Sequence, residues 1–156
     1  MDINELTYAI NGAIFEVNKI LGPGFLEKVY EKALLLELRR RDLKAESQVA
    51  INVIYKGDVV GEYLADIFVE DRVIVEIKTV ENLDKIHEAQ LLNYMKATDI
   101  QVGILVNFKH PKAQIKRMVM NLPHFRPGGL QAGGKGLPVN TRPSRPGISL
   151  RSSAVN

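Results

Sequence analysis

The sequence contains no cysteine. This absence excludes disulfide scaffolds, zinc–thiolate and iron–sulfur sites, and thiol nucleophiles. No apolar run approaches the roughly 20 residues that a membrane-spanning helix requires. The first residues, Met1 to Glu5, are acidic and polar, the reverse of the basic start of a secretory signal peptide. We therefore expect a soluble, cytoplasmic protein that makes no contact with a membrane.

Acidic residues are missing from the last part of the chain. Residues 126–156 contain no Asp or Glu, but they hold six of the 12 Gly, four of the 7 Pro and five Lys or Arg. Such a segment has too little apolar surface to offset the entropy of ordering it, which predicts a disordered basic tail. The remaining residues, 1–125, are long enough for one domain with its own core.

The charge of the chain is divided unequally between these two parts. The whole sequence has 21 Lys and Arg against 18 Asp and Glu, a net charge of +3, and a pI near 9.1. Since five of the basic residues lie in the tail, residues 1–125 carry 16 basic and 18 acidic residues, a net charge of −2. The basic pI is therefore no sign that the folded part binds nucleic acid.

The spacing of apolar residues predicts an α+β domain with a mixed sheet flanked by helices. Helical spacing from Leu6 to Leu21 ends at Gly22-Pro23-Gly24, and three strand-like runs in the middle of the chain predict two successive hairpins. For residues 115–120 a short strand is favoured over a helical turn. The remaining predicted elements are helices over about 26–41 and 82–97 and strands over 48–55, 59–69, 72–79 and 101–108.

Two carboxylates and one lysine lie where strands of this kind are expected to be buried. Asp66 follows Tyr63-Leu64-Ala65, and Glu76 and Lys78 fall within Val73–Lys78, runs that are apolar at both parities. Buried carboxylates are costly unless they are paired or bind a metal. The alternative is that Glu76 and Lys78 form a surface pair on a solvated strand, with Asp66 nearby by chance.

Asp66, Glu76 and Lys78 would suit the hydrolysis of a phosphodiester. Mg²⁺ prefers one or two carboxylates, with waters and phosphate oxygens completing its coordination. It lowers the pKa of a bound water and offsets charge at phosphorus, while a neighbouring lysine can orient that water. A joint site requires Asp66 and Glu76 to lie side by side. A strict two-residue loop at Glu70-Asp71 would separate them, so we predict a three-residue loop, with Val69 opposite Val73, or a bulge.

Two helices carry polar residues that would extend this site. Glu27 and Tyr30 are three residues apart on the second predicted helix, and His87, Gln90 and Tyr94 form a stripe on the third. Taken singly, each has an ordinary explanation: Glu27 suits the first turn of a helix, and an isolated histidine is more often a surface residue.

Together these blocks resemble the GxxExxY family of small bacterial and archaeal proteins, which is placed in the PD-(D/E)XK nuclease superfamily. The resemblance extends from Leu6 to Asn121 and implies a restriction-endonuclease-like α-β-β-β-α-β core. The tail has no counterpart in the family as we know it, and Ala65 stands where the superfamily often has proline. The matching blocks, in order, are Gly24-x-x-Glu27-x-x-Tyr30, Asp66, Glu76-Ile77-Lys78 and Gln90-x-x-x-Tyr94.

The resemblance assigns a role to each of these residues. Asp66 and Glu76 would bind the metal, together with the backbone carbonyl of Ile77, and Glu27 would lie near it. Lys78 would stand beside the attacking water. The residues expected to support the site or bind substrate are Gln90, Tyr94, Tyr30 and His87.

The expected function is a Mg²⁺- or Mn²⁺-dependent nuclease acting on nucleic acid, with DNA favoured over RNA. One small domain has little surface for reading a base sequence, so a homodimer or a partner protein would supply specificity. Three alternatives remain: a nucleic-acid- or partner-binding domain without catalysis, an RNase on the same scaffold, and a purely structural subunit.

Overall fold

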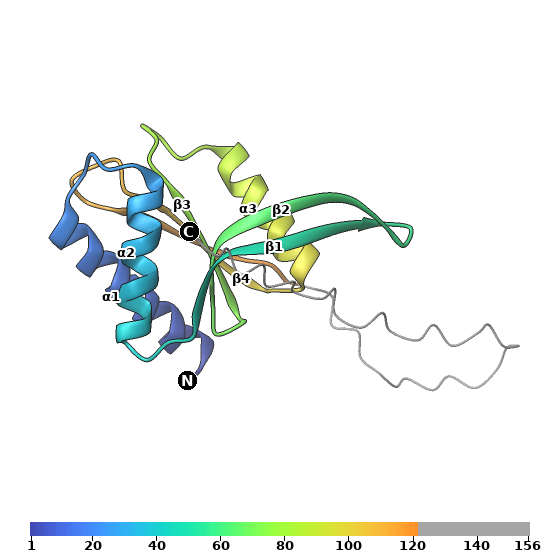
Figure 1. The fold of residues 1–156 in the computed structure, drawn as a ribbon, viewed down its shortest axis with the longest axis horizontal. Helices are drawn as coiled ribbons and strands as arrows, with labels where there is room; N and C mark the ends of the chain where they lie inside the picture. Colours follow the sequence, from blue (N-terminus) through green and yellow to red (C-terminus); the bar gives the residue numbers. More distant parts are fainter. Residues whose placement is uncertain (122–156) are drawn as a thin grey trace, which may run out of the picture.

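The computed structural model of the chain describes residues 1–121, which form three helices and five strands (Figure 1). The tail predicted for residues 126–156 lies outside the described residues. The elements are α1 (Ile3–Leu21), α2 (Glu27–Arg40), β1 (Ala45–Tyr55), β2 (Asp58–Val69), β3 (Val73–Lys78), α3 (Lys85–Thr98), β4 (Val102–Asn107) and β5 (Gln114–Val119).

The helices begin and end at residues that cap them. The Asp2 side chain accepts hydrogen bonds from the first turn of α1, and the Asp2 N–H donates to Glu5 Oε2, which completes a reciprocal capping box. The helix ends at Gly22, whose φ of 67° suits glycine. Asp84 caps α3 in the same way, with His87 in the reciprocal position.

The five strands form one sheet in the order β1-β2-β3-β4-β5. Neighbouring strands are antiparallel except β3 and β4, which are parallel and are connected through α3. The mixed sheet confirms the predicted α+β class, and residues 114–119 form the edge strand favoured from the sequence.

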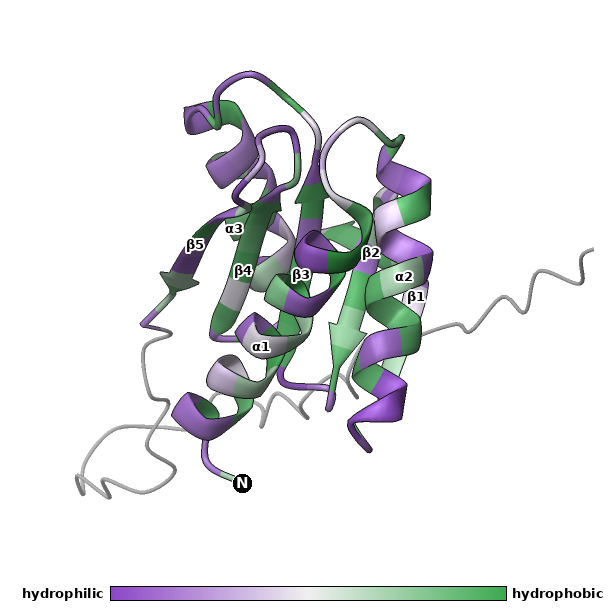
Figure 2. Cartoon of the chain, turned by 90° about the vertical axis from the view of Figure 1, so that its left-hand side faces the viewer, coloured by the Kyte–Doolittle hydropathy of each residue, from purple (hydrophilic) through white to green (hydrophobic). Residues whose placement is uncertain are grey.

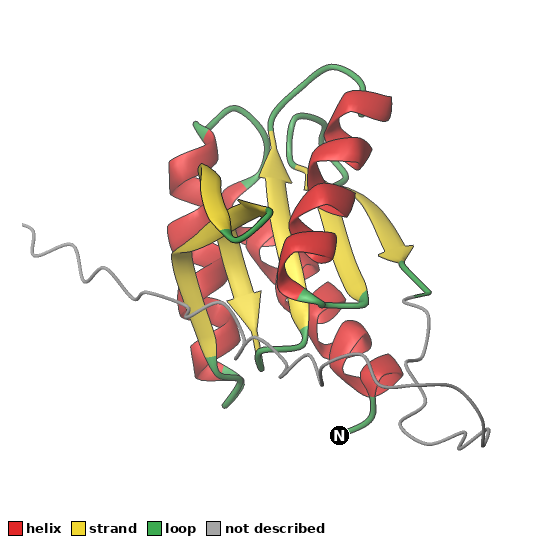
Figure 3. Cartoon of the chain, turned by 90° about the vertical axis from the view of Figure 1, so that its right-hand side faces the viewer, coloured by secondary structure: helices red, strands yellow, loops and turns green. Residues whose placement is uncertain are grey.

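Helices cover both faces of the sheet. Figure 2 shows α1 and α2 side by side on one face, and Figure 3 shows α3 on the other. Each face has its own apolar core, so strands β3 and β4 are buried from both sides. This double coverage explains why both strands are apolar at successive positions rather than at alternate ones.

The hairpin of β1 and β2 extends beyond the sheet (Figure 1). Its two strands pair from Ala45 with Val69 to Tyr55 with Asp58, whereas β3 pairs with β2 only at residues 67–69. Apolar side chains near the turn, including Val59, Val60 and Tyr63, are consequently exposed. The hairpin is therefore a projecting arm beside α3.

The pairing of β2 with β3 is the one that a joint site of Asp66 and Glu76 requires. Val69 pairs with Val73, so residues 70–72 form a three-residue loop. Glu70 and Asp71 take φ values of 52° and 53° in this loop. Within residues 1–121, none of the helices has the length and hydropathy needed to span a bilayer.

Candidate active site

Asp66 and Glu76 meet where strand β2 separates from β3. The last pair of the ladder is Ile67 with Val75, and Asp66 and Glu76 are the next two residues in the same register. In place of backbone pairing, the Asp66 N–H donates to Glu76 Oε1 at 3.1 Å and the Ile77 N–H donates to Asp66 Oδ2 at 2.7 Å. These bonds place both carboxylates in the opening between the strands. We call them the carboxylate pair.

A break in the β1–β2 ladder accompanies this separation. Ser47 pairs with Ile67 and Val49 with Ala65, but Gln48 and Asp66 do not pair between them. Gln48 has a φ of 55°, a strained value for a residue other than glycine. Ile67 packs with the core beneath α1 and α2, whereas Ala65 packs with the core beneath α3. The faces of β2 therefore exchange at Asp66.

The carboxylate pair is held in a poorly solvated position. Glu76 is only 3% exposed, which rules out the alternative of a solvated surface pair. Burial, reinforced by repulsion from Asp66, raises the pKa of Glu76 to about 8. Burial also raises the pKa of Asp66, against the opposing effect of the Ile77 N–H. The pair therefore retains a proton near neutral pH when no cation is bound.

Lys78 belongs to a hydrogen-bonded chain that leads to α3. Its Nζ donates to Gln90 Oε1 at 3.0 Å, and Gln90 Nε2 donates to the Tyr94 hydroxyl at 2.9 Å. The spacing of four residues between Gln90 and Tyr94 places both on the face of α3 that meets β3. Helix α3 thereby holds the ammonium group beside the carboxylate pair. The positive charge of Lys78 opposes the rise in pKa of both Asp66 and Glu76.

Helix α2 adds two further carboxylates, of which only Glu27 was predicted as a site residue. Glu27 is exposed and accepts a hydrogen bond from the Thr79 N–H at 3.2 Å, at the end of β3. Glu31 is buried, accepts a bond from Gln48 Nε2 at 2.8 Å, and contributes to the raised pKa of Asp66. The i, i+4 spacing from Glu27 could have indicated Glu31, but no sequence signal marked Gln48.

Tyr30 supports the site from beneath and does not face it. The residue is fully buried, and its ring stacks on Phe108 with centroids 4.5 Å apart. Its hydroxyl donates to the Gly22 carbonyl at 2.6 Å and accepts from the Phe25 N–H at 3.2 Å. Tyr30 therefore anchors the loop that leads into α2 and Glu27, and it is not placed to contact a substrate.

Asn107 holds the chain that follows Lys78, a role that the sequence did not reveal. It is fully buried, and its side chain accepts from the Val80 N–H at 3.1 Å and donates to the Val80 carbonyl at 2.7 Å. The Phe108 N–H also donates to the Lys78 carbonyl at 2.9 Å. These contacts tie the end of β3 to the end of β4.

His87 lies outside the hydrogen-bonded chain of Lys78, Gln90 and Tyr94. Its Nδ1 accepts a bond from the Asp84 N–H at 3.1 Å, so one nitrogen is used to cap α3. The ring does share a groove with Gln90 and Tyr94 between the arm and the helix. His87 is thus one helical turn before Gln90 on α3 and is used to cap the helix.

The oxygen atoms at the carboxylate pair fit a hard divalent cation. One oxygen of each carboxylate accepts a backbone N–H, which leaves the other oxygen for a cation or a proton. The Ile77 N–H faces the opening, and in a strand the N–H and carbonyl of one residue point to the same side. Two carboxylates and a carbonyl suit Mg²⁺, although no group of three acidic or histidine side chains in the described residues could hold an ion unaided.

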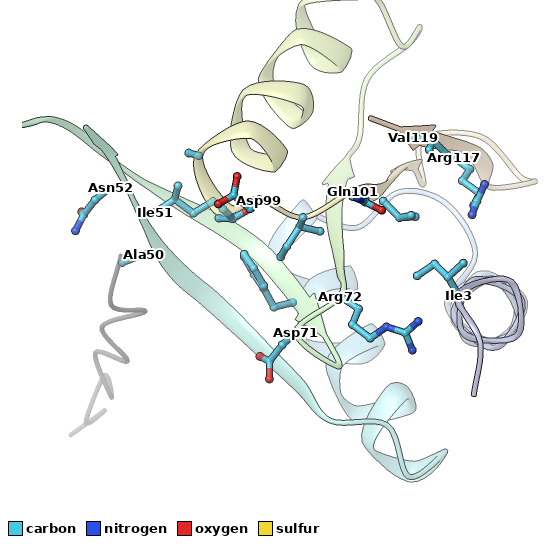
Figure 4. A pocket seen from close by; sticks show the side chains of 15 residues that line it. Ile3, Ala50, Ile51, Asn52, Asp71, Arg72, Asp99, Gln101, Arg117 and Val119 are labelled. Atoms are coloured by element: carbon cyan, nitrogen blue, oxygen red, sulfur yellow. The ribbon is translucent and has the colours of Figure 1, made fainter. Parts of the chain in front are cut away.

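A second hollow lies at the other end of β3 and β4. It has a volume of about 510 Å³ and lies among the β2–β3 loop, the end of α3 and strand β5 (Figure 4). Asp71, Arg72, Asp99 and Arg117 are among its lining residues. None of the predicted site residues borders it, so we do not place the active centre there.

A comparison with known protein families agrees with this fold. A family model described as the PD-(D/E)XK nuclease superfamily matches residues 4–118, well over half of the chain. No curated protein matches the sequence. A solved structure titled "Crystal structure of SSO0001" is 21% identical with a TM-score of 0.47, and the match covers 61% of this chain and 50% of that one. The chain therefore spans about half the length of that protein.

Proposed function

The chain belongs to the PD-(D/E)XK nuclease superfamily, and from this membership we propose that it hydrolyses phosphodiester bonds of nucleic acid. The observation that carries the proposal is the convergence of Asp66, Glu76 and Lys78 in the opening between β2 and β3. Within the superfamily we assign the chain to the GxxExxY family, with DNA as its substrate and the cytoplasm as its location.

The charge of the centre explains why a cation is needed. The charges of Glu27 and Glu31 add to those of Asp66 and Glu76 in this region. Lys78 opposes the charge of Asp66 and Glu76. Lys28 pairs with Glu31 at 3.3 Å, so the described carboxylates outnumber these two cations. A phosphodiester is itself an anion, so repulsion would keep it away from this centre. Asp66, Glu76 and the Ile77 carbonyl would hold Mg²⁺ or Mn²⁺, with Glu27 near it. The ion would activate a water and offset charge on the phosphate.

The remaining residues position the reacting groups. Lys78 donates hydrogen bonds to the attacking water and to a phosphate oxygen, and stabilises the negative charge that develops on phosphorus. Gln90 holds the Lys78 ammonium, and Tyr94 holds Gln90. Glu27 ties the start of α2 to Thr79 at the end of β3. A second copy of the chain or a partner protein would supply any sequence specificity.

Cleavage of plasmid, linear and branched DNA with and without Mg²⁺ or Mn²⁺ tests the proposal. We expect metal-dependent cleavage by the wild type and a loss of about 10²-fold or more in Lys78→Ala, as for the removal of one charge-stabilising donor. Lys32→Ala is the matched control, because Lys32 is exposed on α2 and has no role in the site. It should cleave as the wild type does.

Parallel reactions with RNA separate a DNase from an RNase on the same scaffold. Cleavage of RNA alone would replace the assignment of DNA while leaving the roles of the residues in place. If the wild type and Lys78→Ala were equally inactive on every substrate with both metals, a binding domain without catalysis would be the better explanation.

A further inference from the structure

A groove extends from the proposed active centre between the projecting arm and α3. Its volume is about 1190 Å³, and its lining includes Asn52, Tyr63, His87, Gln90, Asn93 and Lys96. We propose that this groove binds single-stranded nucleic acid, with an unstacked base against Tyr63. This inference rests on the proposed function, since the groove would hold the strand whose phosphodiester reaches the carboxylate pair.

The groove is continuous with the active centre through two residues. Gln90 and Tyr94 line it, and Gln90 is also the acceptor for the Lys78 ammonium at 3.0 Å. A strand lying in the groove would therefore pass the side chain that holds Lys78. This continuity distinguishes the groove from the hollow at the opposite end of the strands.

The lining of the groove differs in charge from the rest of the domain. Residues 1–125 carry more acidic than basic residues, yet none of the described residues that line the groove is Asp or Glu. Its ionisable side chains are Lys96, His87 and the two tyrosines. An anionic strand would meet no carboxylate along this path until it reaches the metal site, where a cation offsets the charge.

Tyr63 offers a surface on which a base can stack. It is 50% exposed, although it lies on β2 directly beside the groove. Its ring is tilted against that of Tyr94, with centroids 5.7 Å apart, so one tyrosine supports the other. Proteins bind unpaired strands by stacking bases on aromatic rings of this kind.

The balance of side chains favours a single strand over a duplex. A duplex keeps its bases stacked and paired, so it presents mainly phosphates, and binding it would require several cations. The groove instead contains one lysine, three side-chain amides and an apolar wall that includes Val53, Ile54 and Ile86. Amides can hydrogen-bond the edges of unpaired bases, and the apolar wall can contact their faces.

The test measures binding of short fluorescein-labelled oligonucleotides by anisotropy, in EDTA so that no cleavage intervenes. Single-stranded DNA, single-stranded RNA and duplex DNA are compared with the full-length protein. We expect the single strands to bind more tightly than the duplex. Tyr63→Ala should weaken single-strand binding about 10-fold, while Tyr63→Phe keeps the ring and retains binding.

Two matched controls separate the groove from general effects. Tyr55→Ala removes an exposed tyrosine of the same arm that does not line the groove, and it should leave binding unchanged. Lys96→Glu should weaken binding, whereas Lys19→Glu should not, although each lysine is in the last turn of its helix. Circular dichroism melting of every variant confirms that the fold is retained.

The outcomes distinguish this inference from the proposed function. If the wild type cleaves nucleic acid but Tyr63→Ala binds single strands normally, the groove proposal fails alone. If the single strands bind through Tyr63 but are never cleaved, the nuclease proposal fails alone. A Kd of about 100 µM is typical of the weakest non-specific complexes with nucleic acid. If neither single strand bound at a protein concentration of about 100 µM, the groove proposal would be overturned and a protein ligand would be favoured.

Discussion

At the scale of single residues, Glu76 has the most unusual environment in the described chain. It is almost completely buried next to Asp66, and its pKa is raised to about 8. An unfolded glutamate has a pKa near 4.3, so between these values the folded state binds more protons than the unfolded state. The free energy of unfolding of the metal-free protein should therefore fall as the pH rises from about 4.5 to 8.

Glu76→Gln should remove most of this pH dependence. The amide cannot ionise, and its oxygen can still accept the Asp66 N–H. At pH 8.5 we expect the free energy of unfolding of the variant to be higher than that of the wild type by on the order of 2 kcal/mol. At low pH the two values should differ little. Urea unfolding in EDTA at the two pH values measures this difference. A wild type with equal stability at both would contradict the raised pKa.

The residue scale also shows which site residues could be anticipated. Asp66, Glu76 and Lys78 could be proposed because charged groups interrupt apolar strands, whereas Gln90 and Tyr94 were proposed from the resemblance to the nuclease superfamily. Glu31, Gln48 and Asn107 were missed. Their importance arises from partners 17 to 27 residues away, such as Glu31 for Gln48 and Val80 for Asn107, and periodicity carries no information about such pairs.

At the scale of elements, the packing of α3 on β4 decides where Gln90 and Tyr94 lie. The close approach occurs at Gly103, where an added Cβ would lie 2.8 Å from Met95 Sδ and 2.9 Å from the Leu91 methyl groups. A larger residue would push the helix away from the sheet. Lys78 would then lose the helix that holds it.

Gly103→Ala should therefore destabilise the protein by about 1 to 3 kcal/mol through overpacking. Gly12→Ala is the matched control, because Gly12 lies inside α1 and its added Cβ would meet only the end of the Arg41 side chain. It should raise stability by about 0.5 to 1 kcal/mol, since alanine favours helix. Thermal and urea unfolding measure both changes. Similar effects of the two substitutions would show that α3 has room to move.

The elements themselves follow from local patterns. Helices α1, α2 and α3 and strands β1 to β5 were all predicted, with ends differing by a few residues. The three-residue loop after Val69 was one of two predicted alternatives, the other being a bulge. Capping residues and turn-forming glycines mark these ends in the sequence. The projection of the β1–β2 arm beyond β3 was not predicted, because it depends on where β3 stops pairing with β2.

At the scale of the whole molecule, charge is divided unequally between residues 1–125 and residues 126–156. Residues 1–125 have a net charge of −2, and residues 126–156 add five basic residues and no acidic ones. The basic charge of residues 126–156 can attract any polyanion regardless of its sequence. In the proposed active centre, a bound metal ion would be needed to attract the phosphate, because the carboxylates there are negative.

Removal of residues 126–156 should weaken binding to duplex DNA at low salt without lowering the unfolding temperature. The slope of log K against log salt should shrink by up to about 4, as five fewer cations displace counterions. Full-length protein with those five Lys and Arg changed to Gln is the control for chain length and should behave in the same way. A lower unfolding temperature after truncation would show instead that the tail contributes to the fold.

The sequence alone determined the class of fold, the order of the elements and the three residues at the proposed centre. These properties depend on periodicity and on the cost of burying charge, which act over a few residues. The superfamily match over residues 4–118 agrees with the class of fold.

Only the tertiary structure decided how the centre is assembled. Strand β2 parts from β3 at Asp66, Gln48 takes a left-handed conformation, and side chain-to-backbone bonds replace the ladder. These features join Gln48, Asp66 and Glu76, which are 10 or more residues apart in the sequence, so local patterns do not predict them. The missing cysteines excluded thiol and zinc–thiolate chemistry, but the opening between the two strands exists only in the folded chain.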